Sequence, residues 1–342
     1  MGGTVAQRGA RAIFEIGLNP YGLTYTVGLQ GWGTSRANPN AVGVDGFIDI
    51  ARAIGARCLE LDSRWLLPLD AAALATLRDH IAPLGYAVIY SQGLTGEPGE
   101  TLAGAIRVTR AIGGTLIRLH LSPVLEGARA ARGSGWTDIV QHARRTLVAE
   151  APRAADTGLD IAIEDHQDFG SEELLDLATN AGPNVGIVLD TGNPFAVGED
   201  PIAFVGRVAP RVRHVHLKDY RAAFTAEGYR LVRCPIGDGS APLAEMAEVL
   251  APHHASLTAS IECGALEARH IRLFTPAWWN GYPPREASEL GTALGRLYAK
   301  RLDERDDYRT PWERNAPGEA IVAYEGNDLD RSVHNLRALG WM

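Results

Sequence analysis

The chain has 342 residues, of which 46% are hydrophobic, and a formal net charge of −8 at pH 7. This apolar content is ample for a large core, and the length fits a single α/β barrel without requiring a second domain. The acidic balance argues against a broad cationic surface for nucleic acid, so small neutral or metal-held substrates are the expected ligands.

The three cysteines, Cys58, Cys234 and Cys263, are widely spaced and form no CxxC motif. Their number and spacing do not suggest a disulfide framework, which fits a reducing compartment. The first residues lack the apolar stretch of a secretory signal, and no run of about 18 apolar residues marks a membrane span. We therefore expect a soluble cytoplasmic protein without membrane contact.

Short β-branched runs alternate with Ala- and Leu-rich stretches of helical periodicity along the chain. Strands are expected at 13–18, 57–62, 87–92, 115–121, 160–166, 185–191, 212–218 and 257–263. Helices are expected at 44–55, 70–84, 99–112, 138–156, 171–181, 200–209, 241–251 and 286–304. Eight repeats of strand and helix allow a parallel sheet to close, which predicts an α/β protein with a (β/α)8 TIM barrel.

A doubly wound open sheet is the alternative fold. Two observations argue against it. The first expected strand is not followed by a GxGxxG turn, and polar residues end several successive strands instead of collecting at one switch point.

Three connections, 18–43, 219–240 and 264–285, are longer than a barrel requires. Each follows a strand, so we expect long loops over the catalytic face, where they would build a pocket or a lid. Beyond residue 305 a charged, Pro-containing segment leads to an amphipathic stretch near 328–339. The expected organisation is a barrel over 1–305 and a C-terminal extension over 306–342, which packs on the barrel or contacts another subunit.

Four residues of metal-binding type end four consecutive expected strands: Glu164, Asp190, His216 and Glu262. The carboxyl ends of barrel strands meet at one rim, so these side chains are expected to lie together. Taken singly, each is better explained as a solvated strand end, a helix cap or, for the histidine, a packed residue. Three carboxylates buried side by side without a cation would be strongly unfavourable, however, and the oxygen and nitrogen donors favour a hard divalent ion such as Mn²⁺, Mg²⁺ or Co²⁺.

The ordered motifs IEDH, LDTGN, HVHLKD, GDG at 237–239 and IE resemble the xylose isomerase-like TIM-barrel superfamily of sugar isomerases and epimerases, over about residues 45–265. The resemblance implies one divalent ion, Mn²⁺ foremost with Mg²⁺, Co²⁺ or Zn²⁺ as alternatives, held by Glu164, Asp190, His216 and Glu262. In ketose 3-epimerase members the two glutamates also move protons, which implies a catalytic role for Glu164 and Glu262. His214 would then sit beside the metal, where it contacts the substrate or supports a ligand.

The chain departs from the family at two substrate-binding positions. A His often lies three residues after the Asp ligand, where this chain has Asn193. An Arg often follows the His ligand by six residues, whereas here Arg221 follows by five and Ala222 by six. Neither departure touches the expected metal ligands.

A divalent ion that grips a carbonyl and a neighbouring hydroxyl acidifies the C–H bond between them, so isomerisation or epimerisation of a sugar through an enediolate is the expected reaction. His166 shares a strand face with Glu164 and titrates near neutral pH, so it is a further candidate base. An alternative is that it only orients a ligand. Expected substrate contacts are Asn193, His214, Lys218 and Trp278.

The same intermediate would expel a leaving group from the β carbon, so a lyase is the alternative function. Aromatic residues in two of the long connections would stack on a sugar or an aglycone, or would simply pack the loops: Tyr21, Tyr25, Trp32, Trp278, Trp279 and Tyr282. The chain is similar to the larger (alpha) subunit of bacterial C-glycoside deglycosidases, which cleave 3-keto C-glycosides with a small β-rich partner. That similarity implies an oligomer with such a subunit.

Two other classes are less compatible with the sequence. A DNA-repair endonuclease of the metal-barrel type would need more ligand residues and a basic rim for phosphates. A non-catalytic sugar-binding protein would need no base beside the metal.

Overall fold

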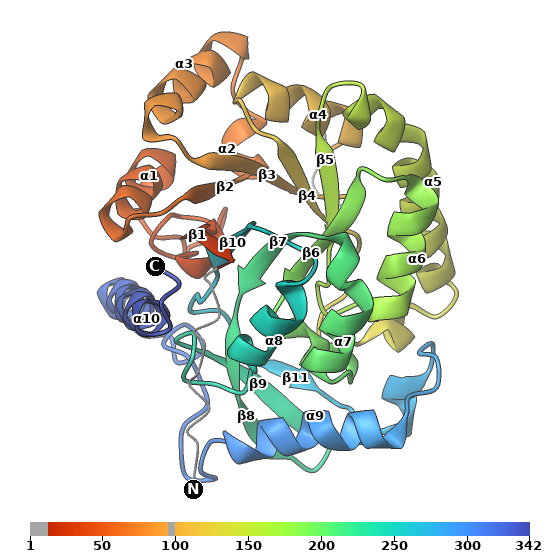
Figure 1. Cartoon of the computed structure of the whole chain (residues 1–342). Coiled ribbons are helices and arrows are strands. Elements are labelled where there is room, and N and C mark those ends of the chain that lie inside the picture. The colour runs from red at the N-terminus through yellow and green to blue at the C-terminus, as the bar shows by residue number, and fades with distance from the viewer. Residues whose placement is uncertain (1–12, 95–99) are drawn as a thin grey trace, which may run out of the picture.

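The computed structural model describes residues 13–94 and 100–342, and its centre is a closed barrel of parallel strands (Figure 1). The strands follow one another around the barrel in the order β1-β10-β7-β6-β5-β4-β3-β2. This closure confirms the expected (β/α)8 barrel and excludes the open sheet. The bounds of the barrel strands are Phe14–Leu18 (β1), Cys58–Asp62 (β2), Ala87–Gly93 (β3), Leu116–His120 (β4), Asp160–Glu164 (β5), Val185–Asp190 (β6), Val212–Leu217 (β7) and Leu257–Ile261 (β10).

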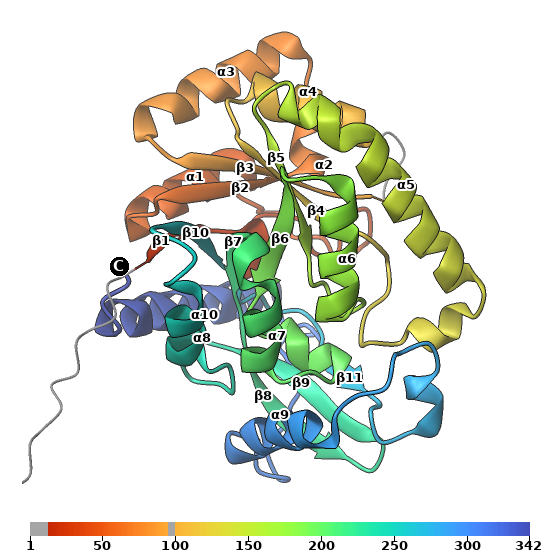
Figure 2. The same cartoon turned by 45° about the vertical axis from the view of Figure 1, so that its right-hand side comes forward.

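Helices surround the barrel, as Figure 2 shows from a second side, and their ends follow local capping chemistry. Asp70, Thr101 and Asp200 each precede a helix and accept hydrogen bonds from its first backbone N–H groups. Most helices lie close to their predicted ranges, at Gly43–Ile54 (α1), Ala71–Ile81 (α3), Leu102–Ala111 (α4), Gly135–Ala155 (α5), Ser171–Ala181 (α6), Pro201–Val208 (α7) and Leu243–Leu250 (α8). The short helix Ser63–Leu66 (α2) was not predicted. Short 3-10 turns occupy Pro20–Gly22, Ala82–Leu84, Arg129–Arg132, Asn193–Val197, Ala209–Arg211 and Pro276–Trp279.

Two of the connections expected as loops instead form a small antiparallel sheet in the order β11-β9-β8. Its strands are Asp219–Thr225 (β8), Gly228–Cys234 (β9) and Arg269–Ile271 (β11). The helix Ala287–Ala299 (α9) lies along this sheet (Figure 1). A second apolar core joins them, formed by residues that include Phe195, Tyr229, Leu273, Trp278 and Leu297.

The helix Gly318–Ala338 (α10) lies beside β1 and β10 (Figures 1 and 2). Leu329, Val333 and Leu336 belong to the main core, and the Trp341 ring centroid is 4.8 Å from that of Phe14 on β1. The extension therefore packs on the barrel. The expected boundary at 305 does not separate two cores: α10 occupies the helical layer next to β1, whereas the expected eighth helix, α9, covers the small sheet.

The barrel strands carry fully buried Ile, Leu and Val side chains that pack with residues of the surrounding helices. A smaller apolar cluster joins Cys58, Ile89, Leu116, Ala162 and Val188. None of the described helices combines the length and the apolarity that a membrane crossing requires.

Candidate metal centre and active-site cavity

The four expected metal ligands converge at the carboxyl ends of neighbouring strands. Glu164 ends β5, Asp190 ends β6, His216 lies near the end of β7, and Glu262 follows β10. The strand register brings them level, because His216 pairs with Asp190 on one side and with Ser260 on the other. One ligand atom from each of the four lies within 4.8 Å of the others, and all four side chains are buried.

His216 is at the centre of this cluster. Its Nδ1 lies 3.0 Å from Glu262 Oε2 and 3.2 Å from Glu164 Oε1, while its Nε2 lies 2.8 Å from Glu60 Oε2. Burial disfavours a charged imidazole, but the negative charges of Glu60 and Glu262 outweigh it and raise the pKa of His216 to about 9. The ring thus presents Nδ1 to the other expected ligands and Nε2 to Glu60.

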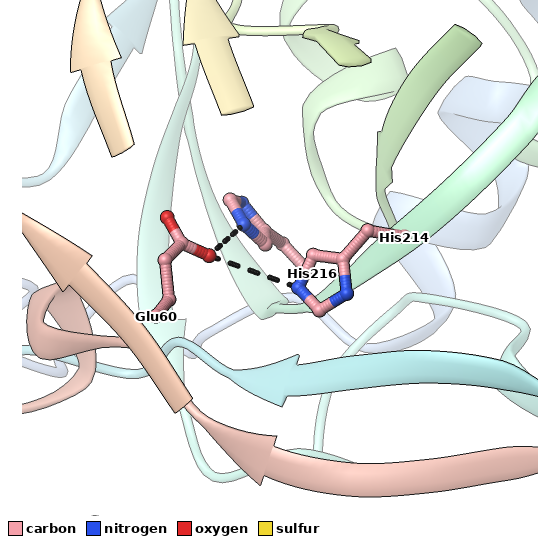
Figure 3. Close-up of side chains that lie close together, drawn as sticks. All are labelled: Glu60, His214 and His216. Atoms are coloured by element: carbon pink, nitrogen blue, oxygen red, sulfur yellow. Dashed lines mark hydrogen bonds and ion pairs between the residues drawn. The ribbon is translucent and has the colours of Figure 1, made fainter. Parts of the chain in front are cut away.

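Glu60, on β2, was not expected from the sequence. Figure 3 shows its carboxylate directed at the rings of both His216 and His214, with Oε2 3.7 Å from His214 Nε2. His214 was expected to contact the substrate, but it is fully buried and bonds Thr258 Oγ1 at 2.7 Å and Ser260 Oγ at 3.1 Å. Burial, with the charge of His216, lowers the pKa of His214 to about 3. Its place is beneath the ligands, so it supports Glu60 and does not reach the cavity.

Two cationic side chains complete the cluster. Lys218 Nζ lies 2.5 Å from both Asp190 Oδ2 and Glu262 Oε1. Arg118, on β4, forms an ion pair with Glu164. Each expected carboxylate ligand therefore has a fixed orientation, set by a neighbouring cation.

The donor set fits a hard divalent ion. Three carboxylates and one imidazole are the ligand types that such ions take in an oxygen-rich site. Within the part of the chain that the structure describes, Glu60 Oε1 and Asp165 Oδ2 are buried without a hydrogen-bond partner. Burial, followed by the charge of Asp190, raises the pKa of Asp165 well above its usual range. The cluster thus has more acceptor oxygens than the surrounding donors fill.

A cavity of about 420 Å³ opens onto this cluster, and Glu262 and Lys218 form part of its wall. His166 also lines it, with its ring centroid 5.1 Å from that of His120. Burial, with the charges of His120 and Arg118, lowers the pKa of His166 well below its usual range, and its Nδ1 has no hydrogen-bond partner among the described residues. The candidate base lines the cavity, and its lowered pKa favours the uncharged imidazole. The remaining lining residues include Tyr21, Gln30, Arg64, Arg118, Gln167, Arg233, Glu267, Arg269 and Trp312.

Asn193 and Trp278 do not line this cavity. Asn193 is buried, and its Oδ1 accepts a hydrogen bond from Gln167 Nε2 at 3.2 Å. Trp278 donates from Nε1 to the Glu126 carbonyl at 2.9 Å and stacks on Tyr282 with centroids 4.5 Å apart. Trp278 therefore lies outside this cavity, packed in the core over the small sheet, and its expected substrate contact stays a prediction.

Among the other aromatic residues of the long connections, Tyr21 reaches the cavity wall. Trp32 is 60% exposed on the surface. The cavity instead receives Trp312, from the segment between α9 and α10 that the sequence had assigned to the extension. Asn19 was also not expected: its Nδ2 lies 3.3 Å from His216 Nε2 and donates to Glu262 Oε2 at 3.2 Å.

The family model described as xylose isomerase-like TIM barrel matches residues 48–270, which is more than half of the chain. The chain belongs to this family. Among curated relatives, inosose dehydratase of Lacticaseibacillus casei is 34% identical over 73 residues, which cover 20% of this chain and 24% of that protein. The chain spans about a quarter of the length of the curated relatives it matches.

Two solved structures share the fold across most of the chain. D-psicose 3-epimerase in the presence of D-fructose superimposes with a TM-score of 0.52 at 16% identity, covering 87% of this chain and 93% of that chain. The IOLI protein with a binding zinc atom gives a TM-score of 0.51 at 13% identity, covering 84% and 96% respectively. At these identities the likeness establishes the common barrel.

Proposed function

We propose that the protein is a divalent-metal-dependent carbohydrate enzyme that removes a proton from the carbon next to a sugar carbonyl, as sugar isomerases and epimerases do. The observation that carries the proposal is the convergence of Glu164, Asp190, His216 and Glu262 in one buried cluster, which meets the cavity through Glu262. The family membership supports it, as does the shared fold with a ketose epimerase.

Glu164, Asp190, His216 and Glu262 would hold the ion, for which the donor chemistry favours Mn²⁺, with Mg²⁺, Co²⁺ or Zn²⁺ as alternatives. A structural neighbour is described with zinc. When bound, a divalent ion acts as a Lewis acid toward substrate oxygens and makes the adjacent C–H more acidic.

The chain's own residues supply the proton transfers. Glu164 and Glu262 come from β5 and from the end of β10, which are separated around the barrel by β6 and β7. They therefore enter the cluster from different strands, which would let them act as a base and an acid on two faces of one carbon. Lys218, between Asp190 and Glu262, would donate a hydrogen bond to a substrate oxygen as negative charge develops on it.

A lyase that acts by β-elimination is the second candidate, and His166 is the observation that favours it. An uncharged imidazole with a free Nδ1 among the described residues faces the cavity beside the expected ligands, so a base is present that need not bind metal. A curated relative is named a dehydratase, and loss of water is an elimination. In this form the protein would cleave 3-keto C-glycosides as the alpha subunit of an oligomer with a small β-rich partner.

Isotope exchange tests both candidates. The Mn²⁺-loaded protein is incubated in D₂O with a panel of ketoses, and separately with 3-keto C-glycosides in the presence and absence of a co-encoded small protein. Deuterium beside the carbonyl supports the isomerase or epimerase, whereas free aglycone without exchanged sugar supports the lyase. Glu164→Gln should abolish either activity, and Glu248→Gln, on the exposed face of α8, should change neither. Bound metal without exchange or cleavage of any substrate would contradict the proposal.

A further inference from the structure

Four arginines line the active-site cavity, and they differ in how their charge is balanced. Arg64 lies 2.9 Å from Asp62 Oδ1 and donates to the Tyr21 hydroxyl, and Arg118 is paired with Glu164. Arg233 and Arg269, by contrast, form no ion pair within residues 13–94 and 100–342. The cavity thus contains two guanidinium groups for which the described chain offers no carboxylate partner.

Arg233 is 6% exposed, yet its Nε and Nη1 have no hydrogen-bond partner in the described parts of the chain. The Nε of Arg269 is likewise buried and without a partner there. The two arginines come from adjacent strands, β9 and β11, which pair antiparallel. Arg269 pairs with Leu231, two residues before Arg233, so both side chains lie on one face of the small sheet. Burial, and next the charge of Arg233, lower the pKa of Arg269.

Nearby acidic groups are engaged elsewhere. Glu267 lines the same cavity, but its Oε1 accepts a hydrogen bond from Trp312 Nε1 at 2.8 Å. Glu126 accepts from the His270 N–H at 3.0 Å and lies 3.5 Å from Arg272. Their charges act on Arg269, but neither carboxylate forms an ion pair with Arg233 or Arg269, so the unfilled N–H groups of this wall are available to a ligand.

A buried cation with unfilled N–H groups destabilises a folded protein, and a second cation beside it adds repulsion. Such an arrangement at a cavity wall is therefore explained most simply by a complementary anion that binds there. The guanidinium group suits an oxyanion well, since its planar N–H fork donates two parallel hydrogen bonds to a carboxylate or a phosphate.

We propose that Arg233 and Arg269 form a subsite for an oxyanion on the substrate, either a carboxylate or a phosphate, so that the natural substrate is an acidic sugar. This rests on the proposed function, because the subsite and the expected metal ligands share one cavity and would hold two parts of the same molecule. The formal net charge of −8 does not conflict with it, since the recognition is local.

Calorimetric titration of the intact protein tests the subsite, with D-glucuronate, D-glucose 6-phosphate and D-glucose as probes at low ionic strength. At least one acidic sugar should bind about 10-fold or more tightly than D-glucose. A preference for the uronate identifies a carboxylate, and a preference for the sugar phosphate identifies a phosphate. Equal affinity for all three probes would overturn the proposal.

Matched substitutions on one strand sharpen the test. Arg233→Met should weaken binding of the acidic sugar by about 10- to 100-fold, as expected for loss of a charged hydrogen bond. Arg230→Met is the control, because Arg230 lies on the same strand with its guanidinium 4.8 Å from the Tyr308 ring, outside the cavity. Arg269→Met, at a less buried position, provides a second variant should Arg233→Met fold poorly. Unchanged binding in both cavity variants would contradict the subsite.

The stability of the ligand-free protein gives an independent readout. Because Arg233→Met removes an unpaired buried charge, it should raise the melting temperature, whereas loss of an internal partner would lower it. Metal binding and isotope exchange with neutral ketoses are measured on the same samples. If these persist without any preference for acidic sugars, the subsite is wrong and the proposed function stands; if wild-type protein binds no metal, the proposed function fails instead.

Discussion

The orientation of His216 depends on a carboxylate that belongs to a different strand. Glu60 lies 2.8 Å from Nε2, which leaves Nδ1 directed at Glu164 and Glu262. A carboxylate behind a metal-binding imidazole fixes its tautomer and makes it a stronger ligand. Glu60 is therefore a positioning residue for the expected metal centre.

Glu60→Gln should weaken Mn²⁺ binding by about 10- to 100-fold, because the imidazole loses its charged partner while the ligands remain. Competition with a fluorescent chelator measures the dissociation constant. Glu248→Gln serves as the control, since Glu248 is exposed on α8 and does not line the cavity. Wild-type affinity in Glu60→Gln would show that the carboxylate does not orient the ring.

Substitution of Trp278 would show whether this residue stabilises the fold or contacts the substrate. The indole is 5% exposed and packed, so Trp278→Ala should lower the free energy of unfolding by about 3–5 kcal/mol. Trp32→Ala, at a side chain that is 60% exposed, should change it by less than about 0.5 kcal/mol. Chemical denaturation measures both. A stable Trp278→Ala protein with impaired substrate binding would restore the original expectation of a substrate contact.

The sequence pattern identified those site residues that end strands, because a polar side chain directly after a buried apolar run lies at the rim of a barrel. It missed Glu60 and Arg118, which lie within strands. The available signal was a charged residue inside the otherwise apolar strands CLELD and LIRLH. Their partners were not readable, because ion pairs such as Arg118–Glu164 join positions 46 residues apart. His214 was placed on the correct face of β7, but its depth below the rim follows only from the barrel's tilt and register.

At the scale of elements, the small sheet was missed although its strands have a recognisable sequence pattern. The alternating stretches DYRAAFT and GYRLVRC form the hairpin of β8 and β9, joined by Ala226 and Glu227. A Gly directly after a short polar turn between alternating runs is a hairpin signal. Treating 219–240 as a loop concealed Arg233 from the expected site, because a residue's direction cannot be assigned before its strand is.

Helix α10 behaves as a barrel helix and not as an appendage, which substitutions along it should show. Leu336 is fully buried in the main core, whereas Leu339 is 43% exposed just beyond the helix end. Leu336→Ala should lower the free energy of unfolding by about 2–5 kcal/mol, and Leu339→Ala by much less. Urea denaturation compares the two. Equal, small effects would indicate that α10 is only loosely attached.

A pH dependence of stability arises in the same helix. Burial, with the charges of Glu325 and Asp238 nearby, raises the pKa of Asp328 to about 7. The unfolded carboxyl ionises near its usual pKa of about 4, so the stability contributed by this group is present below that pH and is lost as the pH rises to about 7. Asp328→Asn should therefore gain stability relative to wild type between about pH 4 and 7. Thermal unfolding across this range checks it, and a constant difference would contradict it.

At the scale of the whole molecule, closure of the eight-stranded barrel was predictable because each strand–helix unit repeats the same period, and register then places the ligand strands side by side. The position of the last helix was not predictable from the sequence, since nothing in the local sequence shows whether α9 or α10 covers β1. The oligomeric state and a small β-rich partner stay predictions, which light scattering of the protein with and without a co-encoded small protein would address.

Metal removal should affect the entire fold, because the expected ligands come from four strands. At free Mn²⁺ about 100 times the dissociation constant, binding should stabilise the protein by about 2.7 kcal/mol relative to chelator-treated protein. Asp190→Asn should lose most of this gain, since one of four ligands is neutralised. Calorimetry with and without chelator measures it. An identical response in Asp190→Asn and wild type would place the ion elsewhere.

The position of α10 has a consequence for how the chain assembles. Glu325 accepts hydrogen bonds from the backbone of Tyr25 and Thr26, across 300 and 299 positions of sequence, and Trp341 meets Phe14. During synthesis on a ribosome, the apolar side of β1 that α10 covers thus stays exposed to solvent until about 300 further residues have emerged. We expect this nascent chain to be the form of the protein that aggregates most readily and that a chaperone would bind.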